Sequence, residues 1–175
     1  MVNYRQDRPR GDSNEGQMAE RVVQIRRVAK VVAGGRRLRF TAMVVIGDQQ
    51  GNVGVGLGKA SAVPDAVRKR VAVARKNMLK VPLRGSTIHH EILVRHSASS
   101  VLLKPAPAGT GVIAGGSVRA VMELAGVTDV VSKVRGSTNP INVVYATFEA
   151  LGQLKDLEGE RARRERLRAV SAGAR

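Results

Sequence analysis

Residues 52–59, NVGVGLGK, alternate glycines with larger side chains, and this segment restricts the fold more than any other part of the chain. Successive side chains of a β-strand point to opposite faces of a sheet, so the aliphatic members should face a core. Glycine weakens a strand, and three alternate glycines indicate close approach by another backbone. That backbone belongs either to the same domain or to RNA that touches the peptide groups beside Lys59. The aliphatic members are Val53, Val55 and Leu57, and the glycines are Gly54, Gly56 and Gly58.

The same glycines match known nucleotide- and RNA-binding motifs only in part. A phosphate-binding loop has the pattern G-x-x-x-x-G-K followed by Ser or Thr, but Val53 replaces its first glycine and Ala60 its hydroxyl. A dinucleotide fingerprint needs a third glycine where Lys59 stands. Gly51 and Gly54 have the spacing of a KH-domain clamp, which lies between helices rather than between strands. A nucleotide-using enzyme is therefore the weaker alternative. The finding of ATP or GTP bound to the protein would support it.

The segments around this strand predict an antiparallel sheet followed by a helix. Residues 22–32 and 36–47 are strand-like, and Gly34 and Gly35 form a turn between them. Residues 64–80 have apolar side chains at helical spacing and a proline near the first turn. The apolar stripe of this helix should cover one face of the sheet and leave its basic side outward. The stripe is Val67, Val71, Ala74 and Met78, and the basic side is Arg68, Lys69, Arg75 and Lys76.

A second unit is expected after residues 81–85, which are interpreted as a linker. Strands are predicted over residues 87–96, 100–107 and 128–136, with a glycine-rich loop over 109–116. A helix is predicted over 117–126 with Ser117 as its N-cap and Gly126 past its end. A last helix is predicted to begin at Pro140, with Asn139 as its cap. The expected domains are 18–85 and 86–157, between a disordered N-terminal tail, 1–17, and a basic helical or disordered tail, 158–175.

Positive charge is concentrated in the first domain. The chain has a net charge of +16, of which residues 18–85 carry +12 and residues 86–157 only +1. Such a basic segment indicates a polyanionic partner. Aromatic residues make up 2% of the chain, too few to stack many bases, so phosphates, peptide groups and shape should carry the recognition.

Several other functional classes are disfavoured. Cysteine is absent, so disulfides and thiolate metal sites are excluded. No apolar run of about 18 residues is present, and a cytoplasmic protein without a membrane span is expected. His89, His90 and His96 are interpreted as structural, so no metal and no cofactor are predicted. A membrane-surface protein remains an alternative, although the helix at 64–80 should use its apolar side on its own sheet.

Two long segments resemble the two domains of protein five of the bacterial small ribosomal subunit. The first is RVAKVVAGGRRLRFTAMVVIGDQQGNVGVGLGKASAVPDAVRKRVAVARKNM. The second is PAPAGTGVIAGGSVRAVMELAGVTDVVSKVRGSTNPINVVYATFEAL. The resemblance extends from about Val22 to Leu154. It implies an α+β protein of two small domains, with an N-terminal β-β-β-α domain related to the double-stranded-RNA-binding fold and a C-terminal α/β two-layer sandwich.

The resemblance also implies a structural, non-catalytic role. Members of the family bind small-subunit ribosomal RNA, contact ribosomal proteins four and eight of the small subunit, and lie near the messenger entry. They support subunit assembly and translational accuracy, and no small-molecule substrate or membrane is involved. A free-standing double-stranded RNA binder or RNA chaperone is the alternative. It would bind generic duplexes as tightly as ribosomal RNA and would stay off ribosomes.

The family pattern assigns roles to individual positions. Residues 28–39 would form a hairpin loop that inserts into RNA near the spectinomycin site, with Ala33 where members often have lysine. Gly111 and Arg119 match the region that faces protein four. Residues 137–142 belong to the family signature GSTNPIN, to which no partner is assigned. The residues predicted to bind RNA, from charge, glycine spacing and resemblance together, are Arg26, Arg27, Lys30, Gly34, Gly35, Arg36, Arg37, Arg39, Gly54, Gly56, Gly58, Lys59, Arg68, Lys69, Arg75 and Lys76.

Overall fold

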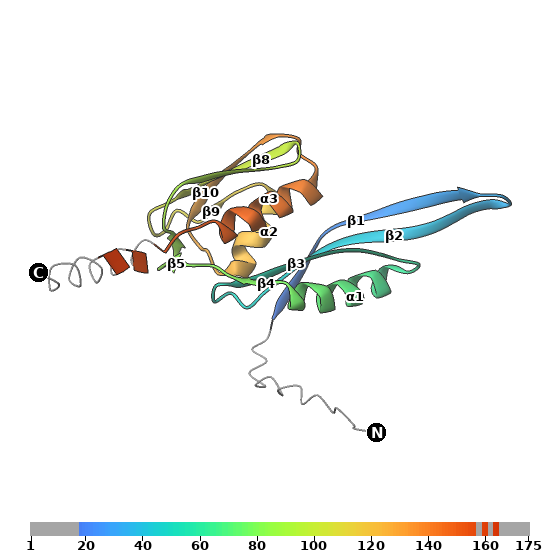
Figure 1. The fold of residues 1–175 in the computed structure, drawn as a ribbon, viewed down its shortest axis with the longest axis horizontal. Coiled ribbons are helices and arrows are strands. Elements are labelled where there is room, and N and C mark those ends of the chain that lie inside the picture. Colours follow the sequence, from blue (N-terminus) through green and yellow to red (C-terminus); the bar gives the residue numbers. More distant parts are fainter. Residues whose placement is uncertain (1–17, 157–158, 161–162, 165–175) are drawn as a thin grey trace, which may run out of the picture.

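The protein consists of four layers, which are a helix, a sheet, a pair of helices and a second sheet. The computed structural model describes residues 18–156, 159–160 and 163–164. A helix, α1 (Val63–Lys76), covers one face of a first sheet, and two further helices separate the opposite face from a second sheet (Figure 1). The α+β class is therefore confirmed.

The first sheet has four antiparallel strands in the order β1-β2-β3-β4. They are β1 (Ala19–Val32), β2 (Gly35–Gly47), β3 (Asn52–Ala60) and β4 (Met78–Lys80). Alternation along β2 and β3 gives the sheet two apolar faces. Ala42, Val44 and Ile46 pack against α1, whereas Met43 and Val45 face the other helices.

The hairpin of β1 and β2 extends far beyond the rest of the molecule (Figure 1). Strand β3 pairs with β2 only from Phe40 to Gly47, so the residues of β2 before Phe40 pair with β1 alone. We call residues 28–39 the arm. Its turn contains Gly34 at φ +90° and Gly35 at φ +143°, and this conformation favours glycine.

The second sheet has the order β7-β8-β10-β9 and carries two helices on one face. Only β9 and β10 are parallel, because α2 connects them as a crossover. A two-stranded hairpin, β5 (Leu83–Arg84) and β6 (Thr87–Ile88), precedes this sheet. The other elements are β7 (Ile92–His96), β8 (Ser99–Pro105), β9 (Val112–Ile113), α2 (Gly116–Ala125), β10 (Val130–Gly136) and α3 (Pro140–Gly152).

The two halves of the chain share one hydrophobic core. Buried residues of β2 and β3 belong to the same cluster as those of α2, α3 and the second sheet. The turn between β2 and β3 also donates two backbone hydrogen bonds to the end of α2, from Gln49 to Leu124 O and from Gly51 to Ala125 O, each 3.0 Å long. Because these contacts are numerous and buried, we expect the orientation of the two halves to be fixed by packing.

Three local predictions are wrong. The helix predicted to reach residue 80 ends at Lys76, because Met78 pairs with Gly54 and places its side chain against the core under α1. Residues 81–85 are not a free linker, since Val81 is buried and donates its N–H to Gly51 O. The N-cap of α2 is Gly115 rather than Ser117. The predicted N-terminal tail and most of the predicted C-terminal tail lie outside the described residues.

Candidate nucleic-acid interface

The hairpin presents a strongly basic face on the side of the first sheet that α3 covers. Residues that pair directly across antiparallel strands point to the same side, and Arg26, Thr41 and Lys59 form one such row across three strands. The rows nearer the tip pair Val28 with Arg39 and Lys30 with Arg37. We call this surface the basic face, and it consists of Arg26, Lys30, Arg37, Arg39 and Lys59, all exposed.

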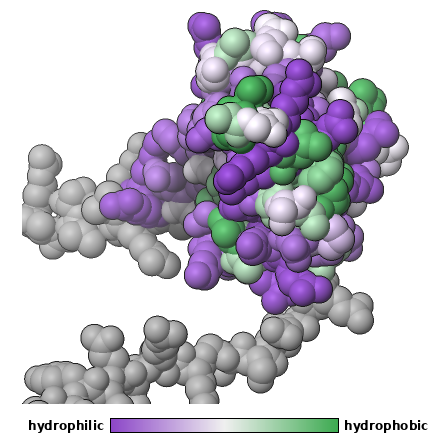
Figure 2. All heavy atoms as spheres, turned by 90° about the vertical axis from the view of Figure 1, so that its right-hand side faces the viewer, coloured by the Kyte–Doolittle hydropathy of each residue, from purple (hydrophilic) through white to green (hydrophobic). Residues whose placement is uncertain are grey.

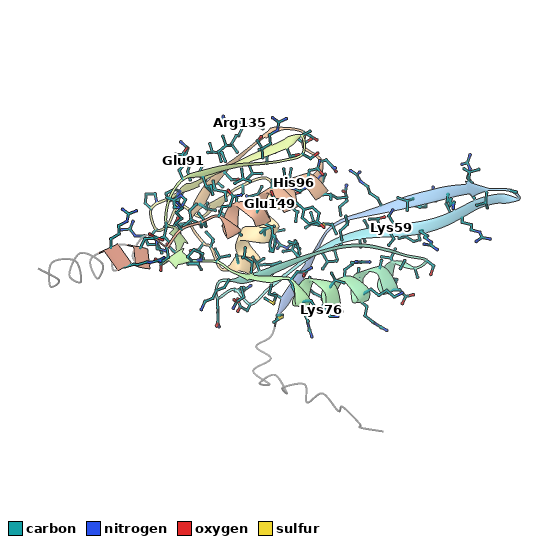
Figure 3. The ribbon with its side chains drawn as sticks, viewed as in Figure 1. Lys59, Lys76, Glu91, His96, Arg135 and Glu149 are labelled. Atoms are coloured by element: carbon teal, nitrogen blue, oxygen red, sulfur yellow. The ribbon has the colours of Figure 1, made fainter. Side chains whose placement is uncertain are left out.

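A hollow of about 390 Å³ lies on the basic face. Side chains of Lys30, Arg37, Arg39 and Lys59 line it, and Val28 lies among them. Lys59 marks the root of the arm, where β3 ends (Figure 3). Because four cations surround one concave surface, this hollow is suited to the phosphates of a polyanion.

The opposite face of the arm is mixed. Ile25, Val31 and Leu38 share it with Arg27 and Arg36, because these residues alternate with those of the basic face. Their exposed fractions of 45%, 73% and 49% show that nothing in the described chain covers them. Seen from the end of the arm, apolar patches lie among hydrophilic side chains (Figure 2). The predicted arm residues are thus divided between two surfaces of different chemistry.

Helix α1 carries a third basic surface. Its apolar side packs on the sheet as predicted, with Ala66 and Ala74 fully buried. Lys76 projects away from the sheet at the end of the helix (Figure 3). The predicted outward residues, which are Arg68, Lys69, Arg75 and Lys76, are all exposed.

The prediction that the glycines of β3 form an open surface for RNA is wrong. Helix α1 lies directly on them, and the carbonyl oxygens of Ala74 and Arg70 occupy the space where side chains on Gly54 and Gly56 would begin. Gly54, Gly56 and Gly58 are buried. The close approach inferred from the sequence is therefore made by the domain's own helix. Because these residues form a strand rather than a loop, the phosphate-loop alternative loses its structural basis.

The second half of the chain reaches the basic face through Asn139. This residue precedes α3 as its N-cap, as predicted, but its side chain does not cap the helix. Asn139 Oδ1 instead accepts a hydrogen bond of 3.3 Å from Arg26 Nη2 at the root of the arm. The family signature over residues 136–142 therefore lies beside the basic face.

The loop that carries Asn139 is held rigidly by its own domain. Ser137 N–H donates to Ala98 O, and Ser99 Oγ donates to Ser137 O at 2.6 Å. Gly136 has φ +75°, and a side chain there would collide with Ala98 O. The loop is consequently a fixed platform rather than a flexible connection.

The two predicted protein-interface residues are brought together around β9. Gly111 N–H donates to Asp129 Oδ1 at 2.9 Å. Arg119 Nη2 donates to the carbonyl oxygen of Val112, the residue after Gly111, at 3.3 Å. The pKa of Asp129 lies below its ordinary value of 3.8, chiefly because Gly111 N–H bonds the carboxylate and also because Ser86 does. A buried carboxylate thus fixes the loop at Gly111.

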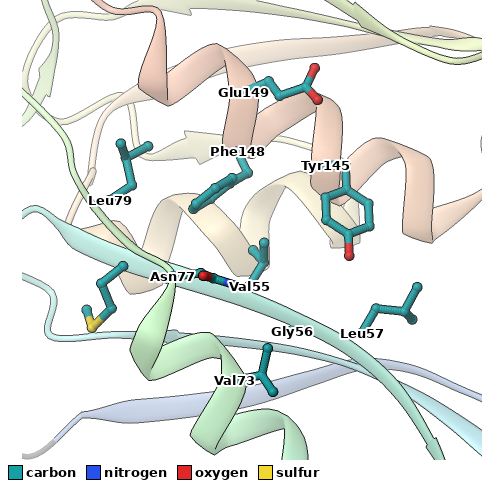
Figure 4. Close-up of a pocket in the computed structure, with 10 residues that line it drawn as sticks. Val55, Gly56, Leu57, Val73, Asn77, Leu79, Tyr145, Phe148 and Glu149 are labelled. Carbon is teal, nitrogen blue, oxygen red and sulfur yellow. The ribbon is translucent and has the colours of Figure 1, made fainter.

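A mainly apolar cavity lies between the two halves of the chain. It measures about 590 Å³, and its lining includes Leu57, Met78, Tyr145 and Phe148 (Figure 4). Glu149, at its edge, is engaged by His96 Nδ1 at 2.7 Å. The other polar side chains in its lining are those of Asn77 and Tyr145.

Comparison with known families agrees with this arrangement. The sequence model of the ribosomal protein S5 N-terminal domain matches residues 18–82. The model of the ribosomal protein S5 C-terminal domain matches residues 94–165. The chain belongs to the ribosomal protein S5 family.

Membership of the S5 family confirms the resemblance seen in the sequence and the organisation into two domains. It identifies a small-subunit ribosomal protein that binds ribosomal RNA and ribosomal proteins, in a family whose role is structural. No helix within the described part of the chain is long and apolar enough to cross a membrane. The matches do not assign roles to individual residues, so the interface residues rest on the geometry above.

Two polar residues of the interface were not predicted. Thr41 and Gln24 lie in apolar strand segments, and the sequence alone gave no reason to select them. Their position follows from the pairing of Arg26 with Thr41 and of Gln24 with Met43, which places both on the basic side of the sheet. Only Thr41 pairs directly with cations, Arg26 on one side and Lys59 on the other, and this pairing is known from the structure alone.

Proposed function

We propose that the basic face is the main ribosomal RNA contact of this S5-family protein, and that the exposed cations of α1 form a second contact. The observation that supports the proposal is the convergence of Lys30, Arg37, Arg39 and Lys59 around one hollow, with Arg26 on the same face in the row of Lys59. Neutralisation of phosphates by these side chains releases counterions. About five such contacts predict a log–log salt slope of about −3.5 to −4.5.

We further propose that the second half of the chain supplies the protein contacts. Leu93, Ile113 and Val131 are exposed on the face of the second sheet that α2 and α3 leave uncovered. This apolar surface, continued at its edge by Gly111 and Arg119, suits ribosomal proteins four and eight. Through both sets of contacts the protein would support subunit assembly, translational accuracy and the messenger entry region. Its place would be in the cytoplasmic small subunit, without a catalytic step, cofactor or small-molecule substrate.

The test of the RNA contact is charge reversal on the arm. The double variant Arg37→Glu/Arg39→Glu should bind small-subunit ribosomal RNA at least tenfold more weakly, with a salt slope shallower by about 1.4 to 1.8, because two phosphate contacts are lost. The control is Arg84→Glu, a single charge reversal at an exposed residue of β5, far from the arm.

Filter binding across a salt series measures both quantities. Equal binding by the arm variant and the control would contradict the proposal. Sedimentation of a lysate in low and high salt separates the ribosomal assignment from the free RNA binder. A ribosomal component should migrate with the small subunit at moderate salt, whereas a free binder should stay near the top of the gradient.

A further inference from the structure

We propose that the ribose–phosphate backbone of an RNA strand crosses the seam between the root of the arm and α3, where Thr41, Gln24 and Asn139 contact it. We call this place the seam site, and its row of Arg26, Thr41 and Lys59 joins it to the basic face. The inference rests on the proposed function, since it places one strand of the bound RNA. It differs from that function in giving the second half of the chain a direct part in RNA binding.

Two buried polar atoms at the seam lack partners. Thr41 is 8% exposed, and its Oγ1 has no hydrogen-bond partner among the described residues. Gln24 Oε1 is likewise buried without one. Gln24 pairs with Met43, two residues from Thr41 on the same strand, so both side chains lie on the basic side in adjacent rows. Buried polar groups are almost always satisfied, so an unsatisfied pair calls for an outside group.

The cations around this pair identify the outside group as part of a nucleic acid backbone. Arg26 and Lys59 flank Thr41 directly across the sheet, and adjacent strands lie about 4.8 Å apart, so the two backbones are about 10 Å from each other. Phosphates that approach Arg26 and Lys59 would therefore carry the intervening sugar past Thr41. The side chain of Arg26 is exposed and, among the described residues, makes one long hydrogen bond, to Asn139, so it can move to admit the strand.

The chemistry of the two atoms favours ribose over deoxyribose. Gln24 Oε1 requires a donor, and the Thr41 hydroxyl can donate. A phosphate oxygen only accepts, so it cannot satisfy Gln24 Oε1 in the amide orientation of this structure. A ribose 2′-hydroxyl both donates and accepts, and it is the group by which proteins distinguish RNA from DNA. One 2′-hydroxyl at the seam site would satisfy both atoms.

Asn139 provides the other wall of the site. Its Oδ1 is used by Arg26, while its Nδ2 has no acceptor among the described residues and is free to donate to a phosphate. The loop around Asn139 is fixed by Ala98 and Ser99, so the donor is held in place before RNA arrives. A strand bound here would touch both halves of the chain.

The variant Thr41→Val tests the inference because it removes a hydroxyl and preserves the side-chain volume. The hydroxyl has no partner among the described residues, so the melting temperature should be unchanged or raised. Affinity for RNA should fall about three- to tenfold, the effect of one hydrogen bond. The probe is the shortest ribosomal RNA fragment that the full chain binds with undiminished affinity, together with copies that carry single 2′-deoxy substitutions.

A double-mutant cycle that combines Thr41→Val with the 2′-deoxy substitutions in the RNA locates the contact. One 2′-deoxy position should weaken binding to the wild-type protein by more than Thr41→Val does, because it also removes the bond to Gln24 Oε1, and its effect on the variant should be smaller than its effect on the wild type. Undiminished binding by Thr41→Val would overturn the inference, as would full additivity at every 2′-deoxy position. Either result would leave the proposed function standing if Arg37→Glu/Arg39→Glu still loses binding.

A second variant tests the wall formed by Asn139. Asn139→Asp keeps the oxygen that Arg26 contacts but replaces the amide donor with a charge that repels phosphate. It should weaken RNA binding by about tenfold or more, whereas Gln153→Glu adds the same charge at the other end of α3 and should change affinity less than twofold. Equal effects of the two variants would show that only overall charge matters and would overturn the assignment of Asn139.

Discussion

The guanidinium of Arg70 occupies the space in which a side chain on residue 58 would begin. Arg70 belongs to α1, and Gly58 belongs to the strand beneath it. The neighbouring glycines are blocked differently. A side chain on Gly54 would meet the backbone of Ala74, and one on Gly56 would meet the carbonyl oxygen of Arg70 itself. The three alternating glycines thus fit one helix onto one strand, two of them against its backbone and one against a side chain.

This difference predicts a graded response to alanine. Gly54→Ala and Gly56→Ala should each lower the free energy of unfolding by about 1–3 kcal/mol or more, because a helix backbone has to move. Gly58→Ala should cost less, because the Arg70 side chain can rotate outward and its Nε has no hydrogen-bond partner within the described part of the chain. Urea unfolding of the RNA-free protein measures the three values. A cost at Gly58 equal to that at Gly54 would contradict this explanation.

The sequence predicted the close approach at these glycines but could not identify the approaching element. The alternation of NVGVGLGK specifies a strand with one bare face, because the period of two follows from strand geometry alone. What covers that face depends on how α1 folds back over the sheet, which is a long-range relation. A helix and an RNA strand both require the same alternate glycines, because each has to approach the backbone of the strand closely. The structure assigns the room to α1.

The carboxylate of Asp129 should make the loop at Gly111 sensitive to acid. The pKa of Asp129 is lower in the folded protein than its ordinary value of 3.8, first because of the Gly111 N–H. The folded state therefore takes up the proton at lower pH than the unfolded state. The stabilisation of the folded state by the ionised Asp129 carboxylate is complete above about pH 3.8. It is lost as the pH falls through the pKa of Asp129 in the folded protein.

Amide hydrogen exchange of Gly111 measures this effect. Protection of its N–H should be constant between pH 5 and pH 7, after correction for intrinsic exchange, and should fall towards pH 3. Asp129→Asn, which remains neutral, should show weaker protection and no such dependence. Asp48 provides an internal comparison, because it caps the turn at Gln50 and Asn52 and should affect that turn alone. Unchanged protection of Gly111 in Asp129→Asn would rule out the carboxylate as its anchor.

The shared core predicts that the two halves unfold together. Gly126 ends α2 at φ +86°, and a side chain there would collide with the carbonyl of Gln49 in the first half. Gly126→Ala should therefore lower stability by about 1–3 kcal/mol from backbone strain alone, and more from the collision. Circular dichroism and hydrogen exchange should show a single transition, with protection reduced equally in β3 and β8. Loss of protection in β8 alone would show that the halves are energetically independent.

The sequence located the basic arm better than it located the seam. Alternation and the Gly34–Gly35 turn predicted a hairpin, and its cations were correctly placed in two strands. Separation into two faces needed the register, which pairs Lys30 with Arg37 and leaves Arg36 on the other side. The seam joins Arg26 to Asn139 across more than a hundred residues of sequence. Local patterns carry no information about such a contact, so Thr41 and Gln24 could not be selected in advance.

The tip of the arm provides the last prediction. Ala33 is exposed in the turn, and it stands where the family pattern often has lysine. Ala33→Lys should not alter the fold, because the side chain would point into solvent. If the tip reaches RNA, the variant should bind ribosomal RNA more tightly, and the log–log salt slope should steepen by about 0.7 to 0.9, the increment of one phosphate contact.

The control for this variant is Ala33→Met, which adds a long side chain without charge. Filter binding of both proteins across a salt series separates charge from bulk, since methionine should leave the slope unchanged. A steeper slope with Ala33→Lys alone would place a phosphate within reach of residue 33. Unchanged slopes in both variants would place the RNA no further out than the pair of Lys30 and Arg37, because no phosphate would then lie within reach of a charge at the turn.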